Sequence, residues 1–214
     1  MNWDEFITPA QDDVKKLFAS QFVQKKLKTG EVLFDQGEED DRLFVLDEGE
    51  LEVSVLSEAG KKLSLNRLLP QCVFGEIAVF DPGPRTARVE ALTACKLRMI
   101  SNRDLVRAIA DAPELTASFL RLAGRRMRWM SAQVEDQVFR PPTARLAAKV
   151  IFLKGAKDEI KMSQAQLADY VGVTREVVSK TLSNWRRDGI VELTRGRIRV
   201  VDLESLVLIQ NHIE

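Results

Sequence analysis

The stretch Phe74-Gly-Glu-Ile-Ala-Val-Phe-Asp-Pro-Gly-Pro-Arg-Thr-Ala87 is the most specific segment of this 214-residue chain. A buried phosphate diester needs a permanent cation, and Arg85 supplies a forked donor that stays protonated under ordinary conditions. Small side chains let backbone amides approach an anion closely, and the segment has three of them: Gly75, Ala78 and Ala87. The segment therefore predicts a phosphate-binding turn. The alternative is an ordinary surface ion pair between Arg85 and Glu76.

Short β-type runs flank this segment between Lys26 and Ile100. They are Val32–Phe34, Leu43–Leu46, Leu51–Leu56 and Lys62–Leu65. Glycines fall between the runs, at Gly30, Gly37, Gly49 and Gly60. Strands at this spacing are typical of an antiparallel barrel or jelly roll. Residues 4–21 predict a short helical lead-in to it.

The order Phe-Gly-Glu-x-Ala followed by Pro-Arg-x-Ala resembles the phosphate-binding cassette of cyclic-nucleotide-binding domains. Upstream, Gly30–Glu38 and Asp41–Gly49 are similar to the sequences that open the barrel of that family. The resemblance extends over nearly the whole chain to the catabolite-activator branch of the Crp–Fnr regulators. One departure is Gln71-Cys72, where the family often has Gly-Asp.

The resemblance implies roles for individual residues of the cassette. Arg85 would clamp the cyclic phosphate, and Glu76 would accept a hydrogen bond from the ribose 2′-hydroxyl. The residues that would line the rest of the site are Gly75, Ile77, Ala78, Thr86 and Ala87. A ligand-free protein with a vestigial cassette is the alternative that these residues leave open.

The identity of the purine rests on four further residues. The resemblance places Met130 and Ser131 where the family has adjacent Thr and Ser against the base, so one hydroxyl is replaced by a thioether. Arg126, one turn earlier, matches an arginine near phosphate and base. Thr86 resembles the arrangement in cyclic-GMP-binding kinases and channels, but bacterial cyclic-AMP regulators also carry Thr there. Cyclic AMP is therefore favoured as the allosteric ligand, with cyclic GMP as the alternative.

A different period begins near Pro113. Mostly apolar or small residues recur at alternating steps of three and four up to Val138: Thr116, Leu120, Ala123, Met127, Met130, Val134 and Gln137. Such an a/d stripe over about three heptads favours parallel dimerisation. Pro141-Pro142 must end the helix because proline lacks the amide donor and restricts the residue before it.

The pattern after the prolines predicts a second fold. Thr143–Leu153 is an amphipathic helix with Leu146, Val150 and Leu153 on one face, and Ile190–Val201 is a hairpin with Arg195-Gly196-Arg197 at its centre. The predicted fold class is α+β. Its parts are a barrel domain over residues 1–112, a dimerisation helix over 113–140 and a winged helix-turn-helix domain over 141–214.

Between that helix and that hairpin, Met162–Trp185 has the helix-turn-helix pattern. Ala168 is small where two helices cross, Gly172 lies at the turn, and Val177 and Leu182 are expected to anchor the second helix. Ser163 and Thr174 are expected N-caps of the two helices.

An exposed polar face on the second helix predicts contact with DNA. Arg175, Glu176, Ser179 and Lys180 gather there with Thr174 at its start, and Arg, Glu and Lys match guanine and cytosine edges in the major groove. Thr-Arg-Glu-x-x-x-Lys resembles the family's recognition helix, which implies a half-site related to TGTGA. The predicted phosphate contacts are Ser163, Gln164, Arg195 and Arg197.

Composition excludes several alternatives. Two cysteines, Cys72 and Cys95, cannot supply the four thiolates of an iron–sulfur cluster and are expected to be buried free thiols. The single histidine, His212, lies outside the barrel, which argues against haem and against a cupin-like metalloenzyme. The chain is therefore predicted not to be an enzyme, and to hold no metal and no cofactor besides its allosteric ligand.

The net charge is zero but unevenly divided. Residues 143–214 carry 12 Lys and Arg against 9 Asp and Glu, while residues 1–142 carry 20 against 23. The C-terminal third is thus the expected partner of a polyanion. No apolar run approaches the roughly 20 residues of a membrane span, and the acidic N-terminus does not resemble a secretion signal. The expected location is the cytoplasm, and the expected partners are double-stranded DNA, a cyclic nucleotide, a second copy of the chain and RNA polymerase.

Overall fold

The computed structural model describes residues 22–155 and 158–211. Within the long helix, between Trp129 and Met130, the chain divides into two compact units. We call the part up to Trp129 the first unit and the part from Met130 the second unit. The predicted lead-in helix over residues 4–21 lies outside the described residues, and the predicted domain limits at 112 and 140 stay predictions.

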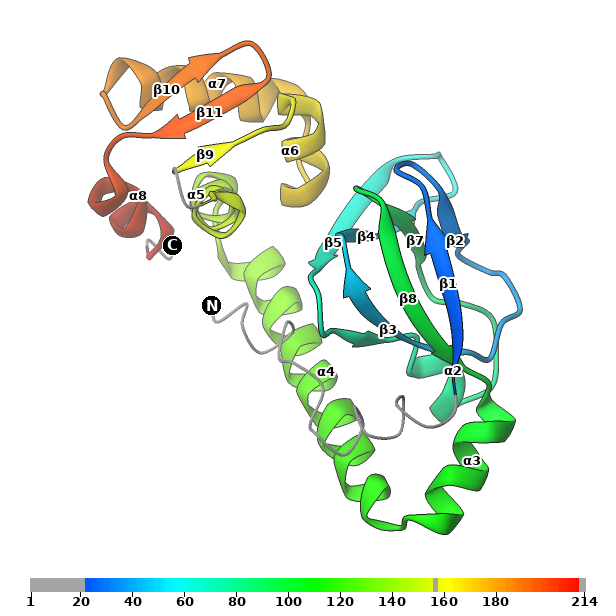
Figure 1. Ribbon diagram of the computed structural model, residues 1–214. Helices are drawn as coiled ribbons and strands as arrows, with labels where there is room; N and C mark the ends of the chain where they lie inside the picture. Colours follow the sequence, from blue (N-terminus) through cyan, green and yellow to red (C-terminus); the bar gives the residue numbers. More distant parts are fainter. Residues whose placement is uncertain (1–21, 156–157, 212–214) are drawn as a thin grey trace. The chain divides into compact units, whose positions relative to one another are not determined.

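The first unit is built on two antiparallel sheets of four strands each (Figure 1). One sheet has the order β1 (Val23–Leu27), β8 (Cys95–Ile100), β3 (Leu43–Glu48) and β6 (Val73–Phe74). The other has the order β2 (Val32–Phe34), β7 (Arg88–Ala91), β4 (Leu51–Leu56) and β5 (Lys62–Leu68). Side chains of both sheets meet in one hydrophobic core, for example Leu27, Phe44 and Leu97 with Leu33, Leu51 and Leu68. The predicted antiparallel β fold is confirmed, and β5 is longer than the predicted run.

The first four residues of strand β3, Leu43–Leu46, are apolar without alternation because both faces of the strand are covered there. Phe44 and Leu46 point into the core between the sheets, whereas Leu43 and Val45 belong to a second core with Leu105 and Phe119. These two residues come from α3 (Asn102–Asp111) and α4 (Glu114–Phe139). A strand buried on both faces is expected to be a continuous hydrophobic run, which is what this stretch shows.

Helix α4 ends at Phe139, just before Pro141-Pro142, as predicted. Its buried residues are Leu115, Ser118, Phe119, Arg126 and Trp129. The predicted a/d stripe lies on another face, where Leu120 and Met127 are each 68% exposed and Val134 is 63% exposed. Ala123 is half-buried, and Thr116, Met130 and Gln137 are exposed. An uncovered apolar stripe of this length fits the predicted dimer seam, although the dimer itself stays a prediction.

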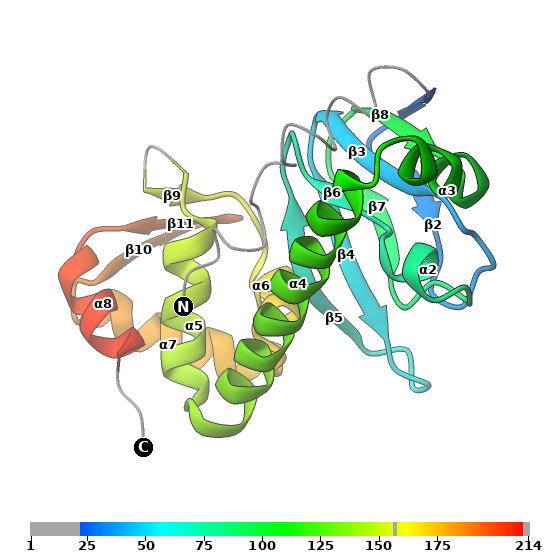
Figure 2. The same ribbon diagram turned by 90° about the horizontal axis from the view of Figure 1, so that it is seen from below.

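The second unit is a helical domain with a small sheet (Figure 2). Its helices after α4 are α5 (Pro142–Leu153), α6 (Gln164–Val171), α7 (Arg175–Arg187) and α8 (Leu203–Gln210). The sheet has the order β10 (Val191–Thr194), β11 (Arg197–Val200) and β9 (Glu159–Ile160), and all its pairs are antiparallel. Helix α5 lies between α6 and α8 in both views and buries Leu146, Val150 and Leu153 in the core of this unit.

The predicted helix-turn-helix is confirmed, with two local corrections. Ser163 caps α6 in a reciprocal capping box with Gln166, and Gly172 ends that helix at φ 74°, a left-handed conformation. Thr174 is the N-cap of α7 by position, but its side chain accepts no capping bond. Leu182 anchors α7 as expected. Val177 does not anchor the helix: it is 38% exposed, and the neighbouring Val178 is fully buried in its place. Adjacent residues point about 100° apart around a helix, and packing against the rest of the unit decides which of the two faces the core.

Candidate functional site

Arg85 is held at its backbone by a second loop of the first unit. Its amide donates to the Glu38 carbonyl at 2.8 Å, and its carbonyl accepts from the Gly37 amide at 2.8 Å. An isolated bridge between Glu39 and Pro84 continues this pairing. The cassette arginine therefore projects from a fixed backbone, although it lies outside regular secondary structure.

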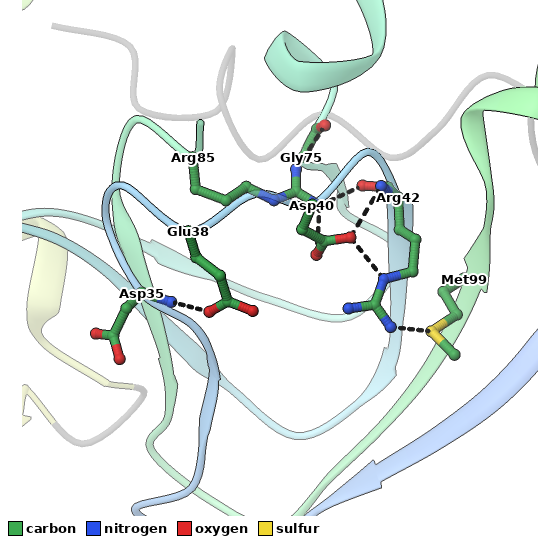
Figure 3. Close-up of polar contacts among 7 residues, drawn as sticks. All are labelled: Asp35, Glu38, Asp40, Arg42, Gly75, Arg85 and Met99. Carbon is green, nitrogen blue, oxygen red and sulfur yellow. Dashed lines mark hydrogen bonds and ion pairs between the residues drawn. The ribbon is translucent and has the colours of Figure 1, made fainter. Parts of the chain in front are cut away.

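The guanidinium group of Arg85 is buried and bonded at both terminal nitrogens (Figure 3). Nη1 donates to the Gly75 carbonyl at 3.0 Å, and Nη2 donates to the Arg42 carbonyl at 2.6 Å and to Asp40 Oδ2 at 2.8 Å. The group also lies over the Phe34 ring, 4.3 Å from its centroid. Only 4% of the residue is exposed. The predicted phosphate clamp is thus a rigid, enclosed cation.

One polar atom of this arginine is left over. The Nε atom of Arg85 is buried and has no hydrogen-bond partner within residues 22–155 and 158–211. A buried donor without an acceptor costs free energy, on the order of 1–3 kcal/mol or more for a charged group. Native proteins rarely tolerate such an atom unless a ligand, ion or water takes it. The arrangement is therefore suited to an anion that accepts from Nε.

Gly75 fits closely against this cation. Its φ is +85°, and a Cβ built on it would lie 2.9 Å from Arg85 Nη1 and 2.9 Å from the Arg42 carbonyl oxygen. No side chain fits there without displacing the guanidinium group or the Arg42 backbone. Glycine is thus required at this cassette position for two reasons, its left-handed conformation and the close approach.

Glu76 pairs with Arg126 rather than with Arg85. Its Oε1 accepts from Arg126 Nε at 3.0 Å, and Arg126 Nη2 donates to the Val73 carbonyl at 2.8 Å. Both partners are buried. The alternative of a surface ion pair between Arg85 and Glu76 is therefore wrong, because each of the two pairs with another residue inside the fold. The structure brings Glu76 and Arg126 together although they lie 50 residues apart in the sequence. Their roles toward a ligand stay predictions.

The remaining cassette residues differ in exposure. Ala78 is buried, Gly75 and Ala87 are half-buried, and Ile77 and Thr86 are exposed. Glu76 and Ile77 begin the single turn of α2 (Ile77–Phe80), whose first amides have no intrahelical acceptor. Met130 and Ser131 are exposed on α4 and belong to the second unit. Their place at the purine stays a prediction.

Two residues of this site, Asp40 and Arg42, were not predicted from the sequence. Asp40 bonds Arg85 through Oδ2, and through Oδ1 it accepts from Arg42 Nε at 2.6 Å. Burial alone would raise the pKa of Asp40, but hydrogen bonds from Arg42 and Arg85 hold that pKa below its usual value. The carboxylate is therefore ionised at neutral pH. The only sequence signal was the acidic run Glu38–Asp41, which does not distinguish its members.

The two cysteines are buried and free, as expected. Burial raises the pKa of the Cys72 thiol, an effect that nearby Arg126 partly opposes. The preceding residue, Gln71, has φ 75°, so it adopts the left-handed conformation that the family's glycine would favour. Gln71 therefore adopts this turn at some conformational cost.

The predicted DNA-reading residues share one side of α7. Arg175, Glu176 and Lys180 are exposed and Ser179 is half-buried, while the opposite side of the helix buries Val178, Leu182 and Trp185. Hydrogen bonds from its own amide and from the Thr174 hydroxyl lower the pKa of Glu176. Glu176 is thus an acceptor at neutral pH, and Thr174 orients it instead of capping the helix.

The predicted phosphate contacts lie on other elements of the second unit. Arg195 and Arg197 are exposed at the turn between β10 and β11, where Arg197 makes a long ion pair of 3.9 Å with Glu159. Ser163 is exposed and engaged in the capping box, and Gln164 is half-buried. Arg186 and Arg187, exposed in the last turn of α7, are further cations that the sequence did not single out, because basic residues also favour helix C-termini.

Comparison with known proteins separates the chain into two matched parts. Residues 24–112 match the family model of the cyclic nucleotide-binding domain, and residues 144–209 match that of the Crp-like helix-turn-helix domain. The CRP-like cAMP-activated global transcriptional regulator of Mycobacterium tuberculosis is 31% identical over 188 residues, with 83% of each chain covered. The cyclic AMP receptor protein of Thermus thermophilus is 25% identical over 186 residues, with 86% of each covered.

Solved structures agree with these matches. A CRP-family transcriptional regulator from Thermus thermophilus has a TM-score of 0.72 and 26% identity, covering 88% of this chain and 97% of that one. The c-di-GMP responsive global regulator CLP of Xanthomonas campestris has a TM-score of 0.79 at 18% identity, covering 89% and 99%, a likeness that shows the fold alone. These relatives are regulators and not metalloenzymes. Within the described ranges, none of the helices has the length and apolar character needed to cross a membrane.

Proposed function

Because the chain is a cyclic-nucleotide-binding, DNA-binding transcription regulator of the Crp/Fnr family, we propose that cyclic AMP controls it. The observation that carries this proposal is the buried Arg85 guanidinium with its unpartnered Nε. A bound phosphate would satisfy this donor, whereas a vestigial cassette would leave it buried and unpaired. The cAMP-activated relatives favour cyclic AMP as the ligand, and cyclic GMP is the alternative that Thr86 supports.

The proposed roles follow from the contacts within the first unit. Arg85 Nε donates to an exocyclic oxygen of the phosphate, and the first amides of α2 supply further donors. Glu76 accepts from the ribose 2′-hydroxyl, since a carboxylate that already accepts from Arg126 retains further lone pairs. Arg126 positions that carboxylate. Met130 and Ser131 are proposed to meet the purine.

For DNA binding, we propose that two copies of the chain form a homodimer along the exposed α4 stripe. Ligand shifts a pre-existing equilibrium between two dimer states and sets the two α7 helices about 34 Å apart, one turn of DNA. Arg175, Glu176 and Lys180 then read a palindromic TGTGA-like site. Arg195 and Arg197 contact phosphates. RNA polymerase is proposed as the further partner of the DNA-bound dimer.

Calorimetric titration with cyclic AMP and cyclic GMP, side by side, tests the ligand assignment. The wild-type protein should bind cyclic AMP saturably and more tightly than cyclic GMP, and Arg85→Leu should abolish binding of both. Arg98→Leu is the matched control, because it also breaks an arginine–aspartate pair of the first unit, with Asp47, outside the cassette. Absence of saturable binding to the wild type, or unchanged affinity in Arg85→Leu, would remove the assignment.

A further inference from the structure

The buried Asp40 carboxylate lies between two guanidinium groups (Figure 3). It accepts from Arg85 Nη2 at 2.8 Å and from Arg42 Nε at 2.6 Å. Its side chain is 4% exposed, whereas that of Arg42 is 34% exposed. Asp40 is therefore a fixed negative charge in direct contact with the cation that is proposed to hold the ligand phosphate.

Asp40 limits the positive charge that a ligand meets here. The buried Arg85 and Asp40 offset one another, and the Glu76–Arg126 pair of the same cassette is neutral. The charge of the partly exposed Arg42 is opposed by Glu38 and Asp41 as well as by Asp40. Little positive charge is therefore left, and a cyclic phosphodiester adds one negative charge to it. A 5′-phosphate monoester, with a second pKa near 6, carries close to two at about pH 7.5, and its surplus charge would be buried without a partner, which is costly.

We propose that Asp40 is a specificity-determining residue, whose charge restricts the cassette to singly charged phosphodiesters and excludes 5′-nucleotide monophosphates. The inference rests on the proposed function and deepens it. It assigns the discrimination between the cyclic ligand and its hydrolysis product to a residue that itself need not touch either of them.

Removing the charge of Asp40 leaves the geometry of Arg85 largely in place. The carbonyls of Gly75 and Arg42 still accept from the guanidinium group, and the Phe34 ring still stacks on it. In Asp40→Asn the amide oxygen still accepts one hydrogen bond. The substitution therefore changes the net charge by one and removes the side-chain hydrogen bond to either Arg85 or Arg42, because one carboxylate oxygen becomes an NH2 donor.

The test measures dissociation constants of cyclic AMP and 5′-AMP by calorimetry at about pH 7.5 and fixed ionic strength. In Asp40→Asn the ratio of the 5′-AMP constant to the cyclic AMP constant should fall at least about tenfold, because one negative charge has left the low-dielectric surroundings of the phosphate. In Asp40→Asn/Arg42→Gln, which restores the original net charge, the ratio should return toward that of the wild type. Asp47→Asn, in the Asp47–Arg98 pair, is the control and should leave the ratio unchanged.

A second measurement needs no substitution. Between about pH 7.5 and pH 5.5 the phosphate of 5′-AMP gains a proton, while cyclic AMP keeps its single charge and Asp40, with its lowered pKa, stays ionised. The wild-type ratio should therefore fall more than about fivefold.

The outcomes separate the two proposals. In protein that binds cyclic AMP, a ratio that stays constant in Asp40→Asn overturns the role of Asp40 alone, whatever the pH dependence of the wild-type ratio. Equal loss of cyclic AMP binding in Asp40→Asn and in the double variant, with both folded by thermal melting, also overturns it and makes Asp40 a positioning residue. A wild-type protein that binds no cyclic nucleotide overturns both proposals.

Discussion

At the scale of single residues, Gly75 is where the cassette is least tolerant of change. Gly75→Ala places a methyl group 2.9 Å from Arg85 Nη1 at a φ of +85°. Backbone strain should lower the free energy of unfolding by about 1–3 kcal/mol. Displacement of the guanidinium group should weaken cyclic AMP binding at least about tenfold, which corresponds to a loss of about 1.4 kcal/mol in binding free energy. Denaturant unfolding and calorimetry measure the two effects.

Gly60→Ala separates the effect of backbone strain from the effect of displacing the Arg85 guanidinium group. Gly60 has φ +75°, but a Cβ there meets nothing within 4 Å. This control should lose stability by a similar backbone penalty and keep its affinity for cyclic AMP. Equal affinities of the two variants would contradict the close approach of Gly75 to Arg85 as a requirement for binding.

Arg85 and Asp40 differ in how far the sequence could predict them. Arg85 and Glu76 follow from the cassette pattern, since a lone arginine among small residues already indicates an anion site. Asp40 does not follow, because Glu38, Glu39, Asp40 and Asp41 are equivalent as a run of acids. Only Asp40 is turned inward by the fold, while the other three are exposed. Asp40 and Arg85 are 45 residues apart, and they pair only because the fold brings two loops together. The local sequence pattern does not predict such a contact.

At the scale of elements, α7 has a polar face whose residues can be tested one at a time for their contribution to DNA binding. We expect Arg175→Ala to weaken binding to a TGTGA-like duplex by about 1–3 kcal/mol and to relax discrimination at one base pair. Fluorescence anisotropy with a set of single-base variants measures both quantities. A loss that is uniform over all sequences would make Arg175 a phosphate contact instead.

Arg187→Ala is the matched control on the same helix. Arg187 is exposed in the last turn of α7 and bonds Asn184, so its removal should leave base discrimination unchanged. The predictions for whole elements were confirmed where the spacing of apolar side chains determines the structure, as it does for the positions of α6 and α7 along the chain. They failed at Val177 and at the Thr174 cap, because a shift of one residue or one rotamer is set by packing against the rest of the domain.

At the scale of the whole molecule, the exposed stripe of α4 predicts the oligomeric state. Leu120→Glu/Val134→Glu places charges on two stripe positions that are 68% and 63% exposed, so each chain should still fold. We expect the protein to sediment as a monomer of 24.2 kDa instead of a dimer, because unpaired charges buried in a helix seam are costly. Sedimentation velocity at several concentrations measures this.

Arg128→Glu, exposed on the same helix but off the stripe, is the control and should remain dimeric. A dimeric double variant would place the interface elsewhere. The stripe was predictable because heptad spacing is a property of one helix. The division of the chain at Trp129 was not, since it depends on which contacts each half of α4 makes.

Strand β3 has a mechanical consequence within the first unit. The ring of Phe44 faces the Arg85 guanidinium, 5.4 Å from its centroid, while the adjacent Leu43 and Val45 press on Leu115 and Phe119 at the start of α4. Besides the direct contact of Glu76 with Arg126, a single strand thus separates the proposed nucleotide site from the start of the long helix. Close-packed interiors transmit strain, so a displacement of the Phe44 side of β3 is expected to shift the Leu43 and Val45 side as well, in parallel with the polar contact between Glu76 and Arg126.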